Sequence, residues 1–243
     1  GASHDSHERC DPPQCYSETG AAVVNFILLW VQDRQRASSI MWLHGPLGAG
    51  KSTIAQRVAE ECEYTRMLCS TFFFSRKTPR RDSSKYLIAT ITYQMIHSIP
   101  ELERPVIDAI ARDPALLSST LQSQIHRLIV DPILVLMSKD EWPKYSPQLI
   151  IIDGLDECED AEIQLLILEV ISDMLITFPV PLCFLVASRI EKAIKREFNT
   201  DRMQKISSQL CLHGSFRSQK SLISSCRSKI SEIRLTQPDP FSR

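Results

Sequence analysis

The sequence predicts an α/β fold in which helices cover both faces of a parallel β-sheet. Three observations support this prediction. Short apolar runs typical of buried strands alternate along the chain with longer segments of helical spacing. The run 149–152 is wholly aliphatic, as expected of a strand that is buried on both faces. A glycine-rich segment at 45–50 separates the first apolar run from the helical segment that follows it.

Five strands and several helices are expected from these patterns. The strands are placed at 40–44, 68–74, 149–152, 182–187 and 208–212. The flanking helices are placed at about 18–32, 51–63, 161–177 and 190–198. Between the second and third strands, 84–147 shows helical spacing and no strand. Pro100, Pro114 and Pro132 should divide this insertion into about three helices, because proline interrupts the hydrogen-bond ladder.

The two ends of the chain differ in composition from the part between them. Residues 1–17 are polar and are predicted to form an irregular lead-in, and 18–213 should form one nucleotide-binding domain. The polar tail 214–243 keeps helical spacing at Leu222, Cys226, Ile230 and Ile233, so one more amphipathic helix is expected there.

Composition argues against several classes of partner. The formal net charge of the 243 residues is -1, which does not suggest a nucleic-acid-binding domain. The apolar stretch 21–31 is too short to cross a bilayer, and no signal peptide opens the chain. The eight cysteines form no C-x-x-C pair, so a zinc site has no support, and this usage indicates a reducing, cytoplasmic setting. One basic cluster is interpreted as a solvated loop: Arg76, Lys77, Arg80, Arg81 and Lys85.

One segment matches the phosphate-binding pattern G-x-x-x-x-G-K-[ST] in full and lies between a predicted strand and a predicted helix. Backbone N–H groups of such a loop turn inward around a phosphate, which requires glycine torsions. Lys51 should neutralise phosphate charge, and the Ser52 hydroxyl should bind Mg²⁺. The competing interpretation is a glycine turn before an ordinary helix. The predicted nucleotide contacts are Gly45, Pro46, Leu47, Gly48, Ala49, Gly50, Lys51, Ser52 and Thr53.

Charged residues follow two of the later predicted strands. Asp153, at the end of an aliphatic run, is predicted to hold Mg²⁺ together with Ser52. Asp156 and Glu157 could orient or activate the attacking water. Arg189 follows the run 182–187 and could contact a γ-phosphate, because ligands of open α/β sheets bind at the carboxyl ends of the strands. The alternatives are an acidic turn without function and a surface arginine that begins a helix.

The chain lacks the N-K-x-D sequence with which small GTPases read guanine, so ATP or ADP is favoured over GTP. Taken together, the phosphate loop and the segments 72–76, 153–157 and 187–189 resemble the NACHT family of STAND P-loop NTPases. The likeness covers about 10–235 and is to the nephrocystin-like N-terminal type that fungi carry. The resemblance implies a three-layer P-loop sandwich with a five-stranded parallel sheet in the order 5-1-4-3-2. It also implies that the Arg189 strand lies between the strands of the phosphate loop and Asp153.

The resemblance further implies an ATP-binding signalling switch. In such a protein, ATP binding and slow hydrolysis set the conformation, and the output is self-association. Two alternatives stay open at this stage. The chain could be a conventional P-loop ATPase or small-molecule kinase, or a truncated nucleotide-binding remnant that no longer signals.

Overall fold

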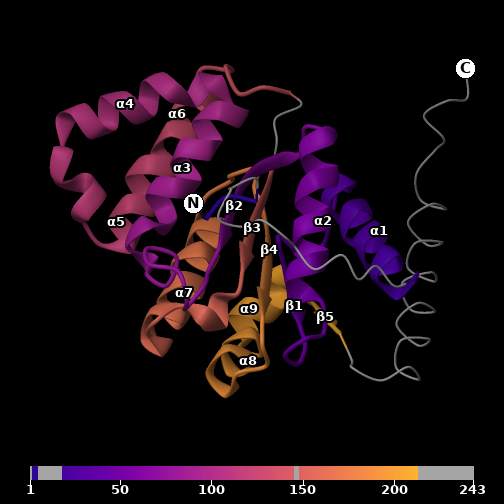
Figure 1. The fold of residues 1–243 in the computed structure, drawn as a ribbon. Helices are drawn as coiled ribbons and strands as arrows, with labels where there is room; N and C mark the ends of the chain where they lie inside the picture. The colour runs from indigo at the N-terminus through magenta and orange to yellow at the C-terminus, as the bar shows by residue number, and fades with distance from the viewer. Residues whose placement is uncertain (1, 5–17, 145–147, 213–243) are drawn as a thin grey trace, which may run out of the picture.

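The computed structural model describes residues 2–4, 18–144 and 148–212. Its centre is a five-stranded sheet in which all pairings are parallel. The strand order is β2-β3-β4-β1-β5, which confirms the predicted order 5-1-4-3-2 (Figure 1). The strands are β1 (Ile40–His44), β2 (Leu68–Phe73), β3 (Leu149–Asp153), β4 (Cys183–Ser188) and β5 (Ser207–Cys211).

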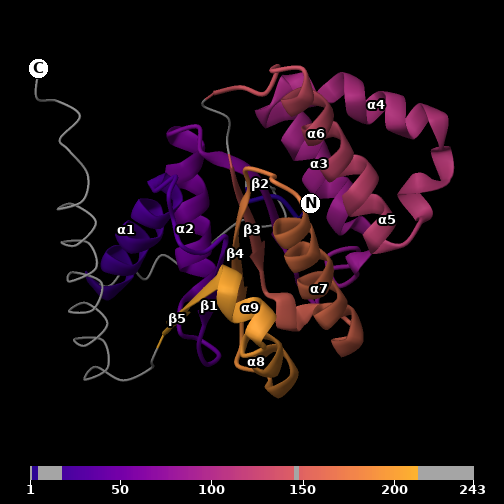
Figure 2. The ribbon, with the colours of Figure 1, turned by 180° about the vertical axis from the view of Figure 1, so that it is seen from behind.

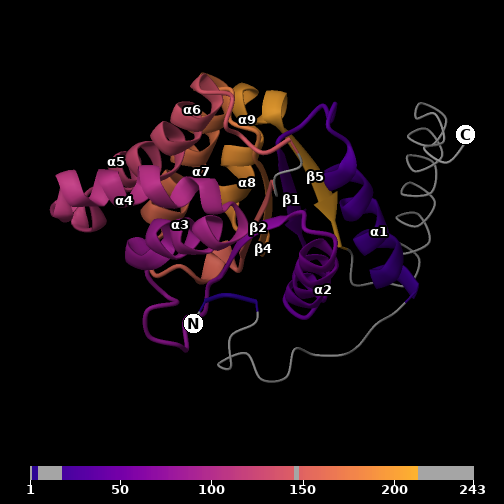
Figure 3. The ribbon, with the colours of Figure 1, turned by 90° about the horizontal axis from the view of Figure 1, so that it is seen from above.

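The sheet has helices on both faces, as predicted. Seen from above in Figure 3, α1 and α2 lie together on one side, and α7, α8 and α9 lie on the other. Figure 2 shows the same layers from behind. One helix, α9, was not predicted; the Thr200 hydroxyl caps it by accepting a hydrogen bond from Met203 N at 3.3 Å. The bounds are α1 (Glu18–Gln32), α2 (Lys51–Tyr64), α7 (Ala161–Thr177), α8 (Lys192–Phe198) and α9 (Asp201–Ile206).

The insertion between β2 and β3 is helical, as predicted, and forms a group of its own beside the sheet (Figure 1). Pro100 and Pro114 each begin a 3₁₀ turn and separate successive helices. The prediction for Pro132 is wrong, because the helical run continues through it: a π-helical turn at His126–Val130 directly precedes α6. The insertion helices are α3 (Leu87–Ser98), α4 (Glu103–Arg112), α5 (Leu121–Ile125) and α6 (Asp131–Ser138).

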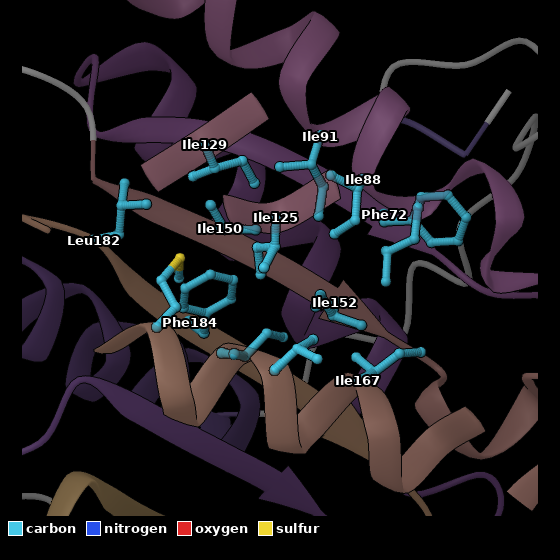
Figure 4. Packing of buried hydrophobic residues seen from close by; sticks show 14 of the residues in the cluster. Phe72, Ile88, Ile91, Ile125, Ile129, Ile150, Ile152, Ile167, Leu182 and Phe184 are labelled. Carbon is cyan, nitrogen blue, oxygen red and sulfur yellow. The ribbon is translucent and has the colours of Figure 1, made fainter. Parts of the chain in front are cut away.

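Apolar packing fixes the sheet against both helical layers. On one face, Ile152 and Phe184 meet Ile88 and Ile91 of α3 and Ile167 of α7, and all five side chains are buried (Figure 4). The opposite face packs on α1 and α2 through a second apolar cluster. Burial on both faces explains why β3 is an unbroken aliphatic run. The two layers hold the strand ends, and therefore the loops that follow them, in fixed positions.

The outer edge of β2 is covered rather than open. Gln94 of α3 accepts a hydrogen bond from Thr71 N at 2.9 Å and donates one to Thr71 O at 2.8 Å. Phe73 N donates to Ala2 O at 2.9 Å, so the described part of the lead-in lies along this edge. The rest of the predicted lead-in and the tail helix lie outside the described residues. No helix within the described ranges is long and apolar enough to cross a membrane.

Candidate functional site

The loop between β1 and α2 requires its glycines for two different reasons. A Cβ atom on Gly45 would lie 2.5 Å from the carbonyl oxygen of Leu212, so only glycine fits there. Gly48 and Gly50 adopt φ values of 77° and 84°, in the left-handed region that favours glycine. Gly50 is also the N-cap of α2, whose first N–H groups therefore point into the loop. The loop can thus present backbone donors to an anion.

Lys51 begins α2 and lies at the centre of a group of charges. Its Nζ atom donates to the carbonyl oxygens of Gly45 and Pro46, each at 2.9 Å. Burial lowers the pKa of Lys51 from its ordinary value, while the carboxylates of Asp156 and Asp153 act in the opposite direction. Glu157 and Arg189 also interact electrostatically with this ammonium group. The structure therefore brings together the lysine, the acidic residues and the arginine that the sequence singled out.

Asp153 is the last residue of β3 and is buried, with 4% of its surface exposed. The chain turns directly after it because Gly154 adopts a φ of 70°. A 3₁₀ turn, Leu155–Glu157, then carries the other two acidic residues. In the sheet, Asp153 is paired in register with Ala187 of β4, two residues before Arg189. The loops after β1, β3 and β4 lie at the same lower edge of the sheet in Figure 1.

Asp156 and Arg189 contact each other directly. The Arg189 backbone N–H donates to Asp156 Oδ1 at 2.8 Å, and Arg189 Nε donates to Asp156 Oδ2 at 2.6 Å. Only 4% of the Asp156 side chain is exposed, against 34% for Arg189. The hydrogen bond to Asp156 raises the pKa of Arg189. Sequence reasoning missed this pair, although it placed both residues after strands; the order of β3 and β4 in the sheet makes them neighbours.

The basic cluster departs from its interpretation as a solvated loop at two members: Arg76 is exposed but also contacts the acidic turn, and Arg81 is buried. Arg76 Nη2 donates to Asp156 O at 2.6 Å, and the Arg76 backbone N–H donates to Glu157 Oε2 at 3.3 Å. Arg81 is only 8% exposed, and its Nε donates to Phe73 O at 2.9 Å. The remaining cluster members Lys77, Arg80 and Lys85 are exposed, as expected.

The residues present fit a nucleotide with Mg²⁺. The Ser52 hydroxyl and the Asp153 carboxylate are oxygen ligands of the kind that Mg²⁺ prefers. Ser52 is exposed in the first turn of α2, and Pro46, Leu47 and Gly48 form an exposed outer part of the loop. Nothing lies within 4 Å of a Cβ atom built on Gly48 or Gly50, so side chains do not fill the space beside them. Ala49 and Thr53 are partly exposed in the same segment.

The strand order, the glycine loop and the acidic end of β3 define a P-loop NTPase fold. The sequence model of the family described as "Nephrocystin 3, N-terminal" matches residues 26–189, which is more than half of the chain. The chain belongs to this family. This result confirms the nephrocystin-like resemblance found in the sequence. A search of curated protein sequences returns no match.

Solved structures resemble the chain only in part of their length. They include "Structure of Drosophila ORC bound to GC-rich DNA and Cdc6", at 9% identity and a TM-score of 0.48, and "Structure of Drosophila ORC bound to poly(dA/dT) DNA and Cdc6 (conformation 1)", at 10% and 0.49. For both, the alignment covers 87% of this chain and 31% of the other. The chain thus spans about a third of the length of these two solved chains. At such identities and TM-scores, the likeness says nothing about what this chain binds.

Proposed function

We propose that the chain is a switch that binds ATP or ADP together with Mg²⁺ and hydrolyses ATP slowly. One observation carries the proposal. Lys51 lies after β1, and Arg189 lies after β4. Next to β4 in the sheet order, Asp153 ends β3 and Glu157 lies in the turn that follows it. All of these charged groups interact electrostatically with Lys51 at the carboxyl edge of the sheet. Ligands of open α/β sheets bind at this edge. A triphosphate is the ligand whose charge such a loop, lysine and arginine complement.

Each residue has a specific task in this proposal. The segment 45–53 surrounds the phosphates with backbone N–H groups, and Lys51 exchanges its two carbonyl acceptors for phosphate oxygens. Ser52 and Asp153 hold the metal, which when bound neutralises phosphate charge. Arg189 contacts the γ-phosphate, so that ATP and ADP are distinguished by one residue.

The acidic turn offers two carboxylates that could activate water, and its geometry favours one of them. Both oxygens of Asp156 accept hydrogen bonds from Arg189, which leaves this carboxylate poorly placed to take a proton. Glu157 is less buried, and Arg76 N donates to it. We therefore assign Glu157 as the base that orients the attacking water. Slow turnover, a conformational change and self-association are the expected output, as in the signalling NTPases that the sequence resembles.

Nucleotide choice follows from what the sequence lacks. Without an N-K-x-D segment, we expect ATP or ADP to bind more tightly than GTP. A competition titration against a fluorescent ATP analogue measures this preference. GTP that competes as well as ATP would overturn this part of the proposal.

The proposal itself is tested by Lys51→Ala. Removal of the ammonium group should weaken Mg·ATP binding by at least about a hundredfold, because charge-assisted bonds to phosphate are lost. Lys139→Ala, at the C-terminal end of α6, serves as a control that removes the same charge far along the chain from the loop. Isothermal calorimetry of both variants and the unmodified chain decides the matter. If Lys51→Ala binds Mg·ATP as tightly as the control does, the site is not a P-loop nucleotide site.

A further inference from the structure

We propose that Asp156 is a positioning residue, which fixes the Arg189 guanidinium for a γ-phosphate, and that Arg76 fixes Asp156 in turn. The proposal rests on the function proposed above and specifies how the site distinguishes ATP from ADP. Arg76, from the loop after β2, and Asp156 would then contribute to recognition of the γ-phosphate without contacting the nucleotide themselves.

The geometry of the pair holds the arginine at two points. One carboxylate accepts hydrogen bonds from both the backbone N–H and the Nε of Arg189, at 2.8 and 2.6 Å. Two contacts of this kind restrict both the main chain and the plane of the guanidinium. Within the described part of the chain, neither Nη1 nor Nη2 of Arg189 takes part in a hydrogen bond. The N–H groups on these atoms remain available to an anion, and 34% of the side chain is exposed.

The other side of Arg189 is held by β1 and β4. Ser188 Oγ donates to Arg189 O at 2.9 Å and accepts a hydrogen bond from Trp42 Nε1 at 2.8 Å. Trp42 is buried in β1 and stacks on Phe198, with ring centroids 4.4 Å apart. The main chain at Arg189 is therefore fixed on both sides, and Asp156 supplies the constraint on the side chain.

Asp156 is itself held by the neighbouring loop. Arg76 Nη2 donates to Asp156 O at 2.6 Å, and Gln164 Nε2 of α7 donates to the same oxygen at 3.5 Å. The three residues Arg76, Asp156 and Arg189 thus follow β2, β3 and β4, which are consecutive in the sheet. A continuous series of contacts leads from the loop before the helical insertion to the arginine beside the phosphate loop.

Burial distinguishes the Asp156–Arg189 ion pair from an ordinary ion pair on the surface. Arg127 and Asp113 also form an ion pair, but their side chains are 37% and 40% exposed. Exposed pairs hold their partners weakly because water competes for both charges. The Asp156 carboxylate is almost fully buried and depends on Arg189 for both hydrogen bonds. An arginine bound in this way meets its ligand with little loss of side-chain freedom, which favours binding.

The experiment compares Asp156→Asn with Asp113→Asn. An amide has nearly the shape of the carboxylate but cannot accept hydrogen bonds from Arg189 on both of its atoms. We expect Asp156→Asn to weaken binding of a non-hydrolysable Mg·ATP analogue by about tenfold and to leave ADP within about twofold. Asp113→Asn should change neither affinity. Because affinities are measured, the result does not depend on whether the chain hydrolyses ATP.

A double-substitution cycle identifies the mechanism. If Asp156 acts through Arg189, the chain with both Asp156→Asn and Arg189→Ala should bind the analogue no more weakly than Arg189→Ala alone. Additive losses would show that Asp156 acts independently and would overturn the proposal. An unchanged analogue affinity in Asp156→Asn, with a loss in Arg189→Ala, would also overturn it while leaving the nucleotide site intact. If the unmodified chain binds no nucleotide, both proposals fail.

A second variant covers the case in which Asp156→Asn does not fold, as judged by circular dichroism. Arg189→Lys keeps the positive charge but cannot give one donor to Asp156 and direct others, in a fixed plane, to a phosphate. We expect it to lose preference for the ATP analogue as fully as Arg189→Ala does. A lysine variant that keeps the preference would show that charge alone is sufficient and would overturn the positioning role.

Discussion

Charged groups meet opposite environments in the apolar layer between the sheet and α2 and at the carboxyl edge of the sheet. In this interior layer, burial raises the pKa of Cys62 in α2 and of Cys183 in β4 to about 12, so even a thiol is held neutral. At the edge, Asp156 and Arg189 form an ion pair although the acid is almost fully buried. The two environments meet at adjacent residues of β3, where buried Ile152 is followed directly by Asp153.

The contrast shows where a buried charge can be tolerated. Removing a charge from water is costly unless opposite charge and hydrogen bonds compensate for it. The interior strands provide neither, because their backbone groups are paired within the sheet. The edge provides both, through the Arg189 side chain and the backbone N–H groups at strand and helix ends. The charges that the fold retains therefore lie at the candidate site.

The largest effect is expected for the buried thiols of the interior. A shift of the thiol pKa from 9.0 to about 12 for Cys62 and Cys183 lowers the thiolate fraction about a thousandfold, so alkylation at about pH 8 should be at least that much slower than in urea. The thiol pKa is higher in the folded than in the unfolded chain. The neutral thiols therefore contribute fully to the free energy of unfolding below pH 9.0, and this contribution is lost as pH rises towards 12. Mass spectrometry after iodoacetamide labelling measures the rates. Equal rates with and without urea would show that the interior does not suppress charge.

At the carboxyl edge, substitution of Glu157 is expected to have a large effect on ATP hydrolysis. Replacement by Gln keeps the shape but removes the base, and should slow ATP hydrolysis by roughly a hundredfold or more. Affinity for Mg·ATP should stay within about threefold, since a base acts on the water and not on the bound ground state. Phosphate release and calorimetry on the same preparation measure both quantities. Undiminished hydrolysis would contradict the assignment of Glu157.

A smaller effect is expected on folding stability, and it compares a buried with an exposed ion pair. Asp156→Asn should lower the free energy of unfolding by about 1–3 kcal/mol, the range for losing hydrogen bonds to a charged group. Asp113→Asn should cost no more than about 0.5 kcal/mol, because its pair with Arg127 is exposed. Urea denaturation provides both values. Equal costs would mean that burial does not distinguish the two pairs.

Much of this arrangement could be predicted from the sequence. Glycines with a lysine and serine at fixed spacing, and an aliphatic run that ends in Asp153, are local patterns whose physical requirements are also local. The order of the strands came from the resemblance and not from any local pattern. Strand and helix bounds were correct to within about two residues, which is the usual uncertainty at element ends.

The contacts across strands could not be predicted in the same way. Arg76 was interpreted as one member of a solvated basic cluster, because its partner, Asp156 O, lies 80 residues further along the chain. The pairing of Asp156 with Arg189 depends on which strand ends are neighbours, and no single segment encodes it. Pro132 was expected to end a helix, but a π-helical turn before it lets the run continue.

The proposed switch depends above all on a contact between Arg189 and the γ-phosphate at the carboxyl edge of the sheet. Paired titrations of Arg189→Ala with Mg·ADP and with a non-hydrolysable Mg·ATP analogue test it most directly. One charge-assisted contact should make the analogue bind roughly tenfold to a hundredfold more weakly and leave ADP nearly unchanged. Equal losses for the two nucleotides, or no loss for either, would contradict the claim and remove Arg189 as the group that distinguishes ATP from ADP.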